Sequence, residues 1–176
     1  MNRAALEHII RASGTITNKD DFVIIGSQSI LGAHPNAPAE LLVSQEVDVY
    51  PKDDPDLSEL LEGTIGEGSP FEKTFGYFVD GVNDKTAILP HGWQDRLVLI
   101  SGPNTRGVRG WCLEPHDLAI SKYVAGREKD LTYTAALARH AMVKRDILEQ
   151  RLDATELDPR VRELVAARIR RDHSGM

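Results

Sequence analysis

Apolar residues repeat with a helical period at the start of the chain and with the pattern of strands further on. Three of them recur at helical spacing within residues 4–12, and Ser13-Gly14 predicts the end of that helix. The short apolar run over 21–25 is typical of a buried strand. Further strands are predicted at 46–50, 76–80, 86–89, 96–100 and 110–113.

The segments between these strands carry helix and loop signals. Asp54-Pro55 has the chemistry of an N-cap followed by a first helical residue, so it predicts the start of a helix. The stretch 63–70 holds three glycines and is interpreted as a flexible loop. A second loop is predicted at 33–38, which contains two prolines.

From Pro115 onward the pattern becomes helical, with helices predicted at 115–125, 128–142, 144–152 and 159–171. The order of elements favours an α/β (α+β) fold, in which helices flank a mixed β-sheet and a helical C-terminal third follows. We expect an α/β core over 1–113 and a helical region over 114–176 that packs on the core.

The composition limits the class of protein. The chain has 176 residues, of which 41% are hydrophobic and 27% charged, as expected for one folded globular domain or for a compact domain with a helical appendix. It has no apolar stretch of membrane-spanning length and no apolar core of a secretory signal at its start. The single cysteine, Cys112, is expected to be a small buried hydrophobic residue. These features predict a cytoplasmic protein without a membrane partner.

Negative charge is concentrated in one part of the chain. The net charge is −6, and the segment from Glu40 to Glu72 contains ten carboxylates and one cation, Lys52. A broad acidic surface repels a polyanion, which disfavours a general nucleic-acid-binding protein. Most of these carboxylates are expected to be solvated, and a few could hold a hard divalent cation.

Gly26-Ser27 follows the predicted strand 21–25 and precedes a predicted helical turn. Free backbone N–H groups and a hydroxyl at such a position favour an anion, and glycine lets a phosphate approach the backbone. The alternative is that Gly and Ser stand here for steric reasons only, as in most strand-to-helix turns.

Glu46 and Asp48 lie two residues apart on a strand that alternates polar and apolar positions. Both side chains therefore project from the same face, with Cα atoms about 7 Å apart. A divalent ion would relieve their mutual repulsion, and Mg²⁺ typically takes one or two protein carboxylates and completes its shell with water and phosphates. The alternative is a strand with one solvated face.

The order of these two features resembles the nucleotidyltransferase superfamily. Its pattern, an apolar residue, Gly and Gly or Ser, then a strand reading carboxylate, apolar, carboxylate, apolar, is matched by Ile25-Gly26-Ser27 and by residues 46–49. The sequence is most similar to the minimal nucleotidyltransferases and to the toxin-like branch of bacterial toxin–antitoxin and phage-defence systems. That branch often carries a Lys, Arg and Asp segment after the sheet, similar to residues 117–130 here.

The resemblance implies a set of roles. It implies two-metal transfer of a nucleotidyl group from a nucleoside triphosphate to an RNA, protein or small-molecule acceptor, with Mg²⁺ or Mn²⁺. Glu46, Asp48 and a third carboxylate would bind the metal, while Gly26 and Ser27 would hold the phosphates. A cognate toxin or antitoxin protein is an expected partner.

Three further residues complete the predicted site, each with an alternative. Asp80 is the best match for the third carboxylate, but Asp80-Gly81 is also a common hairpin turn. Lys122 and Arg127 are candidates to neutralise the triphosphate. The alternatives are a Lys122 stem lying along the core with its head in water, and an ion pair between Arg127 and Asp130.

Two departures from the family pattern bear on activity. Eighteen residues, 28–45, separate Ser27 from Glu46, more than the usual spacing, and two prolines mark the insertion. The first carboxylate is Glu rather than Asp, which would move the metal outward by about one methylene. A catalytically inactive member of the fold that acts by binding a partner, and a plain structural α/β domain, are therefore the competing hypotheses.

Overall fold

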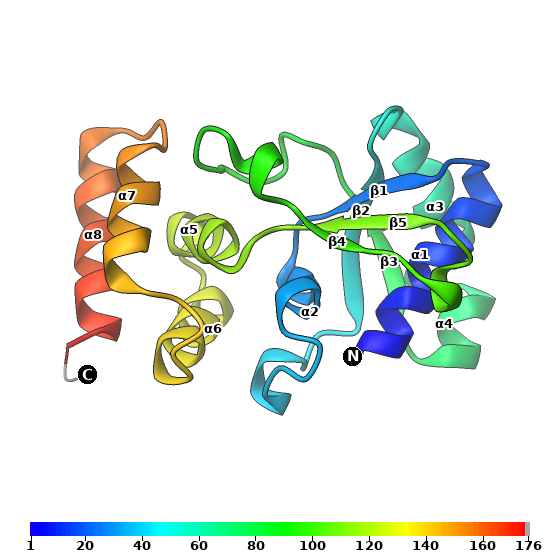
Figure 1. The fold of residues 1–176 in the computed structure, drawn as a ribbon, viewed down its shortest axis with the longest axis horizontal. Coiled ribbons are helices and arrows are strands. Elements are labelled where there is room, and N and C mark those ends of the chain that lie inside the picture. The colour runs from blue at the N-terminus through cyan, green and yellow to red at the C-terminus, as the bar shows by residue number, and fades with distance from the viewer. Residues whose placement is uncertain (175–176) are drawn as a thin grey trace. The chain divides into compact units, whose positions relative to one another are not determined.

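The structure is a computed structural model that describes residues 1–174, within which the chain forms five strands and eight α-helices (Figure 1). The strands are β1 (Asp21–Ile24), β2 (Glu46–Pro51), β3 (Phe78–Gly81), β4 (Val98–Ile100) and β5 (Arg109–Cys112). The helices are α1 (Arg3–Thr17), α2 (Ile30–Ala33), α3 (Ser58–Ile65), α4 (Pro70–Phe75), α5 (Pro115–Ala125), α6 (Glu128–Arg139), α7 (Arg145–Asp153) and α8 (Pro159–Asp172). The predicted α/β (α+β) class with a helical C-terminal part is confirmed.

The chain divides into two compact units. The first comprises residues 1–86 and 97–113 and contains the sheet with α1 to α4. The second comprises residues 87–96 and the chain from residue 114 on, and contains α5 to α8. No helix in the described part of the chain is both long and apolar enough to cross a membrane.

The sheet of the first unit is mixed, with the strand order β3-β2-β1-β5-β4. The central strand β1 runs antiparallel to β2 and parallel to β5. The outer pairs are β2 with β3, which are parallel, and β4 with β5, which are antiparallel. The carboxylate-bearing strand β2 is therefore paired on both sides.

Helices α1 and α3 cover one face of this sheet. A side chain at Gly110 would come within 2.4 Å of Ile10 in α1, and one at Gly81 within 2.5 Å of the Ser58 carbonyl at the start of α3. The register places Gly110 and Gly81 on the same face as Val49. Because side chains alternate along a strand, the residues between them point to the opposite face. The buried side chains of the covered face include Leu6, Ile9, Phe22, Ile24, Val47, Val49 and Leu61.

The second unit is built from helices that pack on one another. Helix α5 contacts α6, α7 and α8, and α7 contacts α8. Its buried apolar side chains include Leu118, Ile120, Leu137, Leu148, Val165 and Ile169. The predicted helical pattern is confirmed for all four helices, of which α8 begins at Pro159 with the Asp158 side chain accepting from Arg160 N–H.

Helix α1 is longer than predicted. It continues through Ser13 and Gly14 to Thr17 and ends at Asn18, which has a left-handed conformation with φ 55°. Gly14 lies against Val108, whose Cγ2 would be 2.6 Å from a Cβ at that position. The glycine thus allows close packing instead of ending the helix, so the predicted stop at Ser13-Gly14 is wrong.

Two further local predictions are wrong. Residues 86–89 form a bend and irregular structure rather than a strand, and Ile88 is half exposed, so this apolar stretch has no buried face to pair. The glycine-rich stretch 63–70 includes the end of α3 and leads directly into α4. Ser69 caps α4 by accepting from Glu72 N–H. This Ser-x-x-Glu pattern indicates a helix start, whereas the loop prediction was based on the glycines.

Cys112 is fully buried in β5, as predicted. Burial raises the pKa of its thiol to about 12, because the thiolate would lose its hydration in the apolar core. The side chain therefore acts as a small hydrophobic residue and not as a nucleophile.

Candidate functional site

The Gly26-Ser27 turn lies directly beyond the end of β1. Ile25 N–H donates to the Asp48 carbonyl at 3.1 Å, which carries the pairing with β2 one residue past the strand. Gly26 is extended, and Ser27–Ser29 form a short 3-10 helix that leads into the four-residue helix α2. The helical segments are short, so their axial dipole is small, and an anion at this turn would rely on individual N–H and hydroxyl groups.

The Asp48 carboxylate lies against the backbone of this turn. An ideal Cβ built on Gly26 would be 1.5 Å from Asp48 Oδ2 and 2.4 Å from Asp48 Cγ. Only glycine leaves room for that carboxylate, because a Cβ would occupy the same space. The two features that were predicted separately, the phosphate turn and the carboxylate strand, thus meet at one place.

Asp80 lies opposite Asp48 on the neighbouring parallel strand. The register of β2 and β3 pairs Asp48 with Asp80, and paired strands are about 4.8 Å apart. Both side chains therefore project from the sheet face opposite α1 and α3. Asp80-Gly81 belongs to β3 and not to a hairpin turn, so the turn interpretation of these two residues is wrong.

Glu46 is the first residue of β2 and shares the face of Asp48, two residues away. Among residues 1–174, no three or more His, Cys, Asp or Glu side chains are arranged to hold a metal ion. The pair of Asp48 and Asp80 still fits the chemistry of Mg²⁺, which needs only one or two protein carboxylates when substrate phosphates supply further oxygens.

Lys122 and Arg127 lie in the second unit and share one partner, Asp130. Lys122 Nζ is 3.3 Å from Asp130 Oδ1, and Arg127 Nε is 2.6 Å from Asp130 Oδ2. The predicted pairing of Arg127 with Asp130 is confirmed. The predicted solvated head of Lys122 is wrong, because its side chain is only 11% exposed and its ammonium lies 4.7 Å from the centre of the Tyr133 ring.

Asp130 organises this cationic pair, although the sequence indicated it only as a partner of Arg127. Its side chain is 1% exposed. Burial by itself would raise the pKa of Asp130, but the hydrogen bond from Arg127 and the charge of Lys122 hold this pKa below its usual value. Asp130 is therefore an anion that fixes both cations. The sequence indicates the pairing of Asp130 with Arg127 through their spacing of three residues, about one helical turn.

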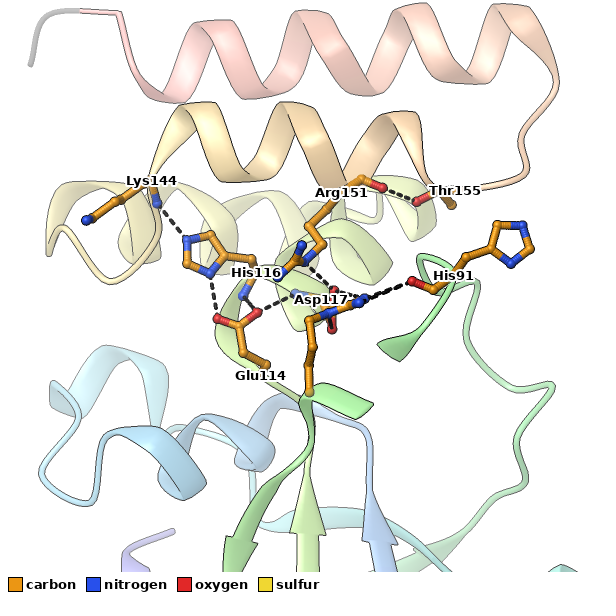
Figure 2. Close-up of polar contacts among 8 residues, drawn as sticks. His91, Glu114, His116, Asp117, Lys144, Arg151 and Thr155 are labelled. Atoms are coloured by element: carbon orange, nitrogen blue, oxygen red, sulfur yellow. Dashed lines mark hydrogen bonds and ion pairs between the residues drawn. The ribbon is translucent and has the colours of Figure 1, made fainter. Parts of the chain in front are cut away.

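A second buried carboxylate, Asp117, connects α5 with the segment 87–96 and with α7 (Figure 2). Arg96 donates to both of its oxygens, at 2.8 and 3.0 Å, and Arg151 Nε lies 3.1 Å from Oδ1. Burial raises the pKa of Asp117, and the two guanidinium groups oppose that effect. Paired in this way, Asp117 serves the packing of the second unit.

Glu114 and His116 tie the start of α5 to the start of α7 (Figure 2). Glu114 caps α5 by accepting from the His116 and Asp117 N–H groups, and its Oε1 is 2.6 Å from His116 Nδ1. The other ring nitrogen of His116 accepts from Lys144 N–H at 3.0 Å. These two contacts together require a neutral ring that carries its proton on Nδ1.

The structure thus gathers the predicted residues into two groups. Gly26, Ser27, Glu46, Asp48 and Asp80 belong to one end of β1 and to one face of β2 and β3 in the first unit. The cationic pair belongs to α5 and the start of α6 in the second unit.

A mixed sheet whose Gly-Ser turn lies against a carboxylate-bearing strand agrees with the pattern that the sequence shares with the nucleotidyltransferase superfamily. The family described as nucleotidyltransferase of unknown function (DUF6036) matches residues 4–171, and the chain belongs to this family. The predicted superfamily is confirmed, whereas the family description does not extend to the toxin-like branch. No curated protein and no solved structure matches the chain.

Proposed function

We propose that this chain is a metal-dependent enzyme that transfers a nucleotidyl group from a nucleoside triphosphate to an acceptor. The observation that carries the proposal is the contact between the Asp48 carboxylate and the Gly26 backbone, with Asp80 opposite Asp48 on the next strand. Carboxylates that hold a metal and a turn that holds phosphates have to be neighbours for this chemistry, because the metal bridges to the phosphate oxygens.

In the proposed reaction, an acceptor hydroxyl forms a bond to the α-phosphorus and releases its proton to water. The bond from the α-phosphorus to the bridging oxygen breaks, and pyrophosphate leaves. Gly26 and Ser27 hold the terminal phosphates through backbone N–H and hydroxyl groups.

Asp48 and Asp80 are the residues that would hold Mg²⁺ or Mn²⁺, with Glu46 next to them on β2. When bound, the ion neutralises negative charge that develops on the phosphates during transfer. The paired strands fix the backbone positions of these two aspartates. This suits a site that holds its ion in a defined orientation without surrounding it.

The proposal extends to the acceptor and to the biological role. The acceptor is an RNA, a protein or a small molecule that offers a hydroxyl group. The resemblance to the toxin-like branch adds a role in a bacterial toxin–antitoxin or phage-defence system, with a cognate toxin or antitoxin protein as partner.

The test combines binding and transfer. Purified protein is incubated with Mg²⁺ and each α-labelled nucleoside triphosphate, together with total RNA or co-purified protein, and label on either acceptor is quantified. We expect transfer by the wild type and at least a hundredfold less by the Glu46→Gln/Asp48→Asn variant, on the scale of lost electrostatic stabilisation. The matched control is Glu59→Gln/Glu67→Gln, which neutralises two exposed carboxylates and should transfer normally.

Thermal unfolding in the presence of Mg²⁺ and each triphosphate separates the remaining hypotheses. Stabilisation of the wild type without any transfer would support the non-catalytic binding protein. If the protein shows no stabilisation and no transfer with any of the four triphosphates, the nucleotide site itself is refuted. The structural domain is then the correct description.

A further inference from the structure

The Gln28 side chain links the two ends of the long connection between the phosphate turn and β2. Gln28 lies directly after Gly26-Ser27, and its Nε2 donates to the Ser44 carbonyl at 3.1 Å. The residues between Gln28 and Ser44 contain α2 and a second 3-10 helix, Ala39–Leu41, and belong to the inserted segment 28–45. Gln28 is 1% exposed, so this bond is shielded from water.

Ser44 in turn contacts Glu46, the first carboxylate residue of β2. Its Oγ accepts from Glu46 N–H at 3.2 Å and lies 3.4 Å from the Glu46 carbonyl. Further along β2, the Asp48 carbonyl accepts from Ile25 N–H. Two hydrogen bonds therefore connect the turn with β2. One runs from the Ile25 backbone to the Asp48 carbonyl, and the other from the Gln28 side chain to the Ser44 carbonyl, two residues before Glu46.

The Gln28 amide is only half satisfied. Its Oε1 is buried and has no hydrogen-bond partner among the described residues. A buried acceptor without a donor costs about 1–3 kcal/mol, whereas an apolar side chain of similar shape avoids that cost. Fold stability alone therefore does not explain a glutamine here. Methionine would fill the same space with no unsatisfied oxygen, and the Ser44 carbonyl would keep the Met1 ammonium as a donor at 3.2 Å.

We propose that Gln28 is a positioning residue that sets Glu46 relative to the Gly26-Ser27 turn. This inference rests on the proposed function, since Glu46 matters only if the carboxylate face binds a metal. Pairing of Glu46 with Phe78 fixes the start of β2 to β3. The Gln28 bond adds the link to the phosphate turn, which a connection of eighteen residues does not by itself hold in place.

The test uses Mn²⁺ alone as the probe and counts free Mn²⁺ by electron paramagnetic resonance. Gln28→Met keeps the side-chain volume and removes the donor. We expect its Mn²⁺ affinity to fall roughly three- to tenfold, the range of one net hydrogen bond, while its urea midpoint equals or exceeds that of the wild type. The matched control is Gln45→Met, the same exchange at an exposed neighbour of Ser44, which should leave both values unchanged.

A double-mutant cycle tests whether Gln28 acts through Glu46. In a Glu46→Gln background, Gln28→Met should have no further effect on Mn²⁺ affinity, because the group it positions is gone. Equal losses in both backgrounds, or wild-type Mn²⁺ affinity in Gln28→Met, would overturn the inference. If Gln28→Met does not fold, Gln28→Leu replaces it in the same cycle.

The outcomes for the two proposals are distinct. Wild-type protein that binds no Mn²⁺ and transfers no label would refute the proposed function, and the role of Gln28 with it. Wild-type protein that binds Mn²⁺, together with an unaffected Gln28→Met variant, would refute only the role of Gln28.

Discussion

The contact between Gly26 and Asp48 shows how one residue type decides whether the site exists. A glycine in this turn was predicted as an approach for phosphate, but in the structure its missing Cβ first makes room for the Asp48 carboxylate. The backbone at Gly26 has a negative φ of −82°, which most residues adopt without strain. The requirement for glycine is therefore one of space and not of backbone conformation.

Gly26→Ala should displace the Asp48 carboxylate, since the new Cβ and Oδ2 cannot share the same position. We expect a loss of roughly 1–3 kcal/mol in the free energy of unfolding, the usual cost of overpacking, and Mn²⁺ binding too weak to measure. Urea denaturation and Mn²⁺ titration check the two effects.

Gly63→Ala is the matched control. Gly63 lies inside α3, and nothing is within 4 Å of a Cβ built there. Alanine should stabilise this helix by about 0.5–1 kcal/mol without affecting Mn²⁺ binding. Normal Mn²⁺ affinity in Gly26→Ala would contradict the assigned position of Asp48 in the site.

At the scale of the elements, local chemistry made the C-terminal helices predictable. Asp158-Pro159 and Pro115 mark helix starts in the sequence, and α8 and α5 begin at these prolines. The strand predicted at 86–89 failed because its apolar residues have no partner strand, which only tertiary structure decides. The face of β2 was predictable from alternation, whereas the pairing of Asp48 with Asp80 depends on strand register, which the chain pattern does not contain.

The start of α5 should respond to acid. Burial by itself would raise the pKa of Glu114, but the hydrogen bond from the His116 ring, together with those from two backbone N–H groups, holds this pKa below its usual value. A carboxylate with a depressed pKa stabilises the fold above its ordinary pKa of about 4.3, and that contribution disappears as the pH falls through the lower folded-state pKa.

Glu114→Gln should therefore flatten the acid limb of the stability curve. The free energy of unfolding, measured in urea between about pH 6 and 3, should decrease less steeply in the variant than in the wild type, because one linked proton is removed. Glu149→Gln on α7, where the carboxylate is half exposed, is the control. An unchanged slope in Glu114→Gln would show that this cap does not contribute to acid sensitivity.

At the scale of the whole molecule, the charges are divided between the two units. The acidic segment 40–72 lies entirely in the first unit, which also holds the carboxylate face. Lys122, Arg127 and their partner Asp130 lie in the second. An RNA acceptor would therefore meet a protein whose net charge of −6 opposes non-specific binding of polyanions.

Without a triphosphate, the wild type should bind mixed-sequence single-stranded RNA with a dissociation constant weaker than about 100 μM at physiological salt. Fluorescence anisotropy measures this directly. A Glu59→Lys/Glu62→Lys/Glu67→Lys variant changes the net charge from −6 to 0, since each exchange adds two units, and should bind more tightly. Micromolar, strongly salt-dependent binding by the wild type would instead indicate an RNA-binding surface that outweighs the acidic segment.

The pairing of β2 on both sides has a thermodynamic consequence. Strand β2 is hydrogen-bonded to β1 and to β3, so the backbone that carries Glu46 and Asp48 is already ordered by its neighbours. An ion that binds there has no chain segment to organise, and the conformational entropy lost is limited to a few side-chain rotamers. Association at this face is therefore preorganised, and its rate should be governed by encounter rather than by a slow rearrangement of the sheet.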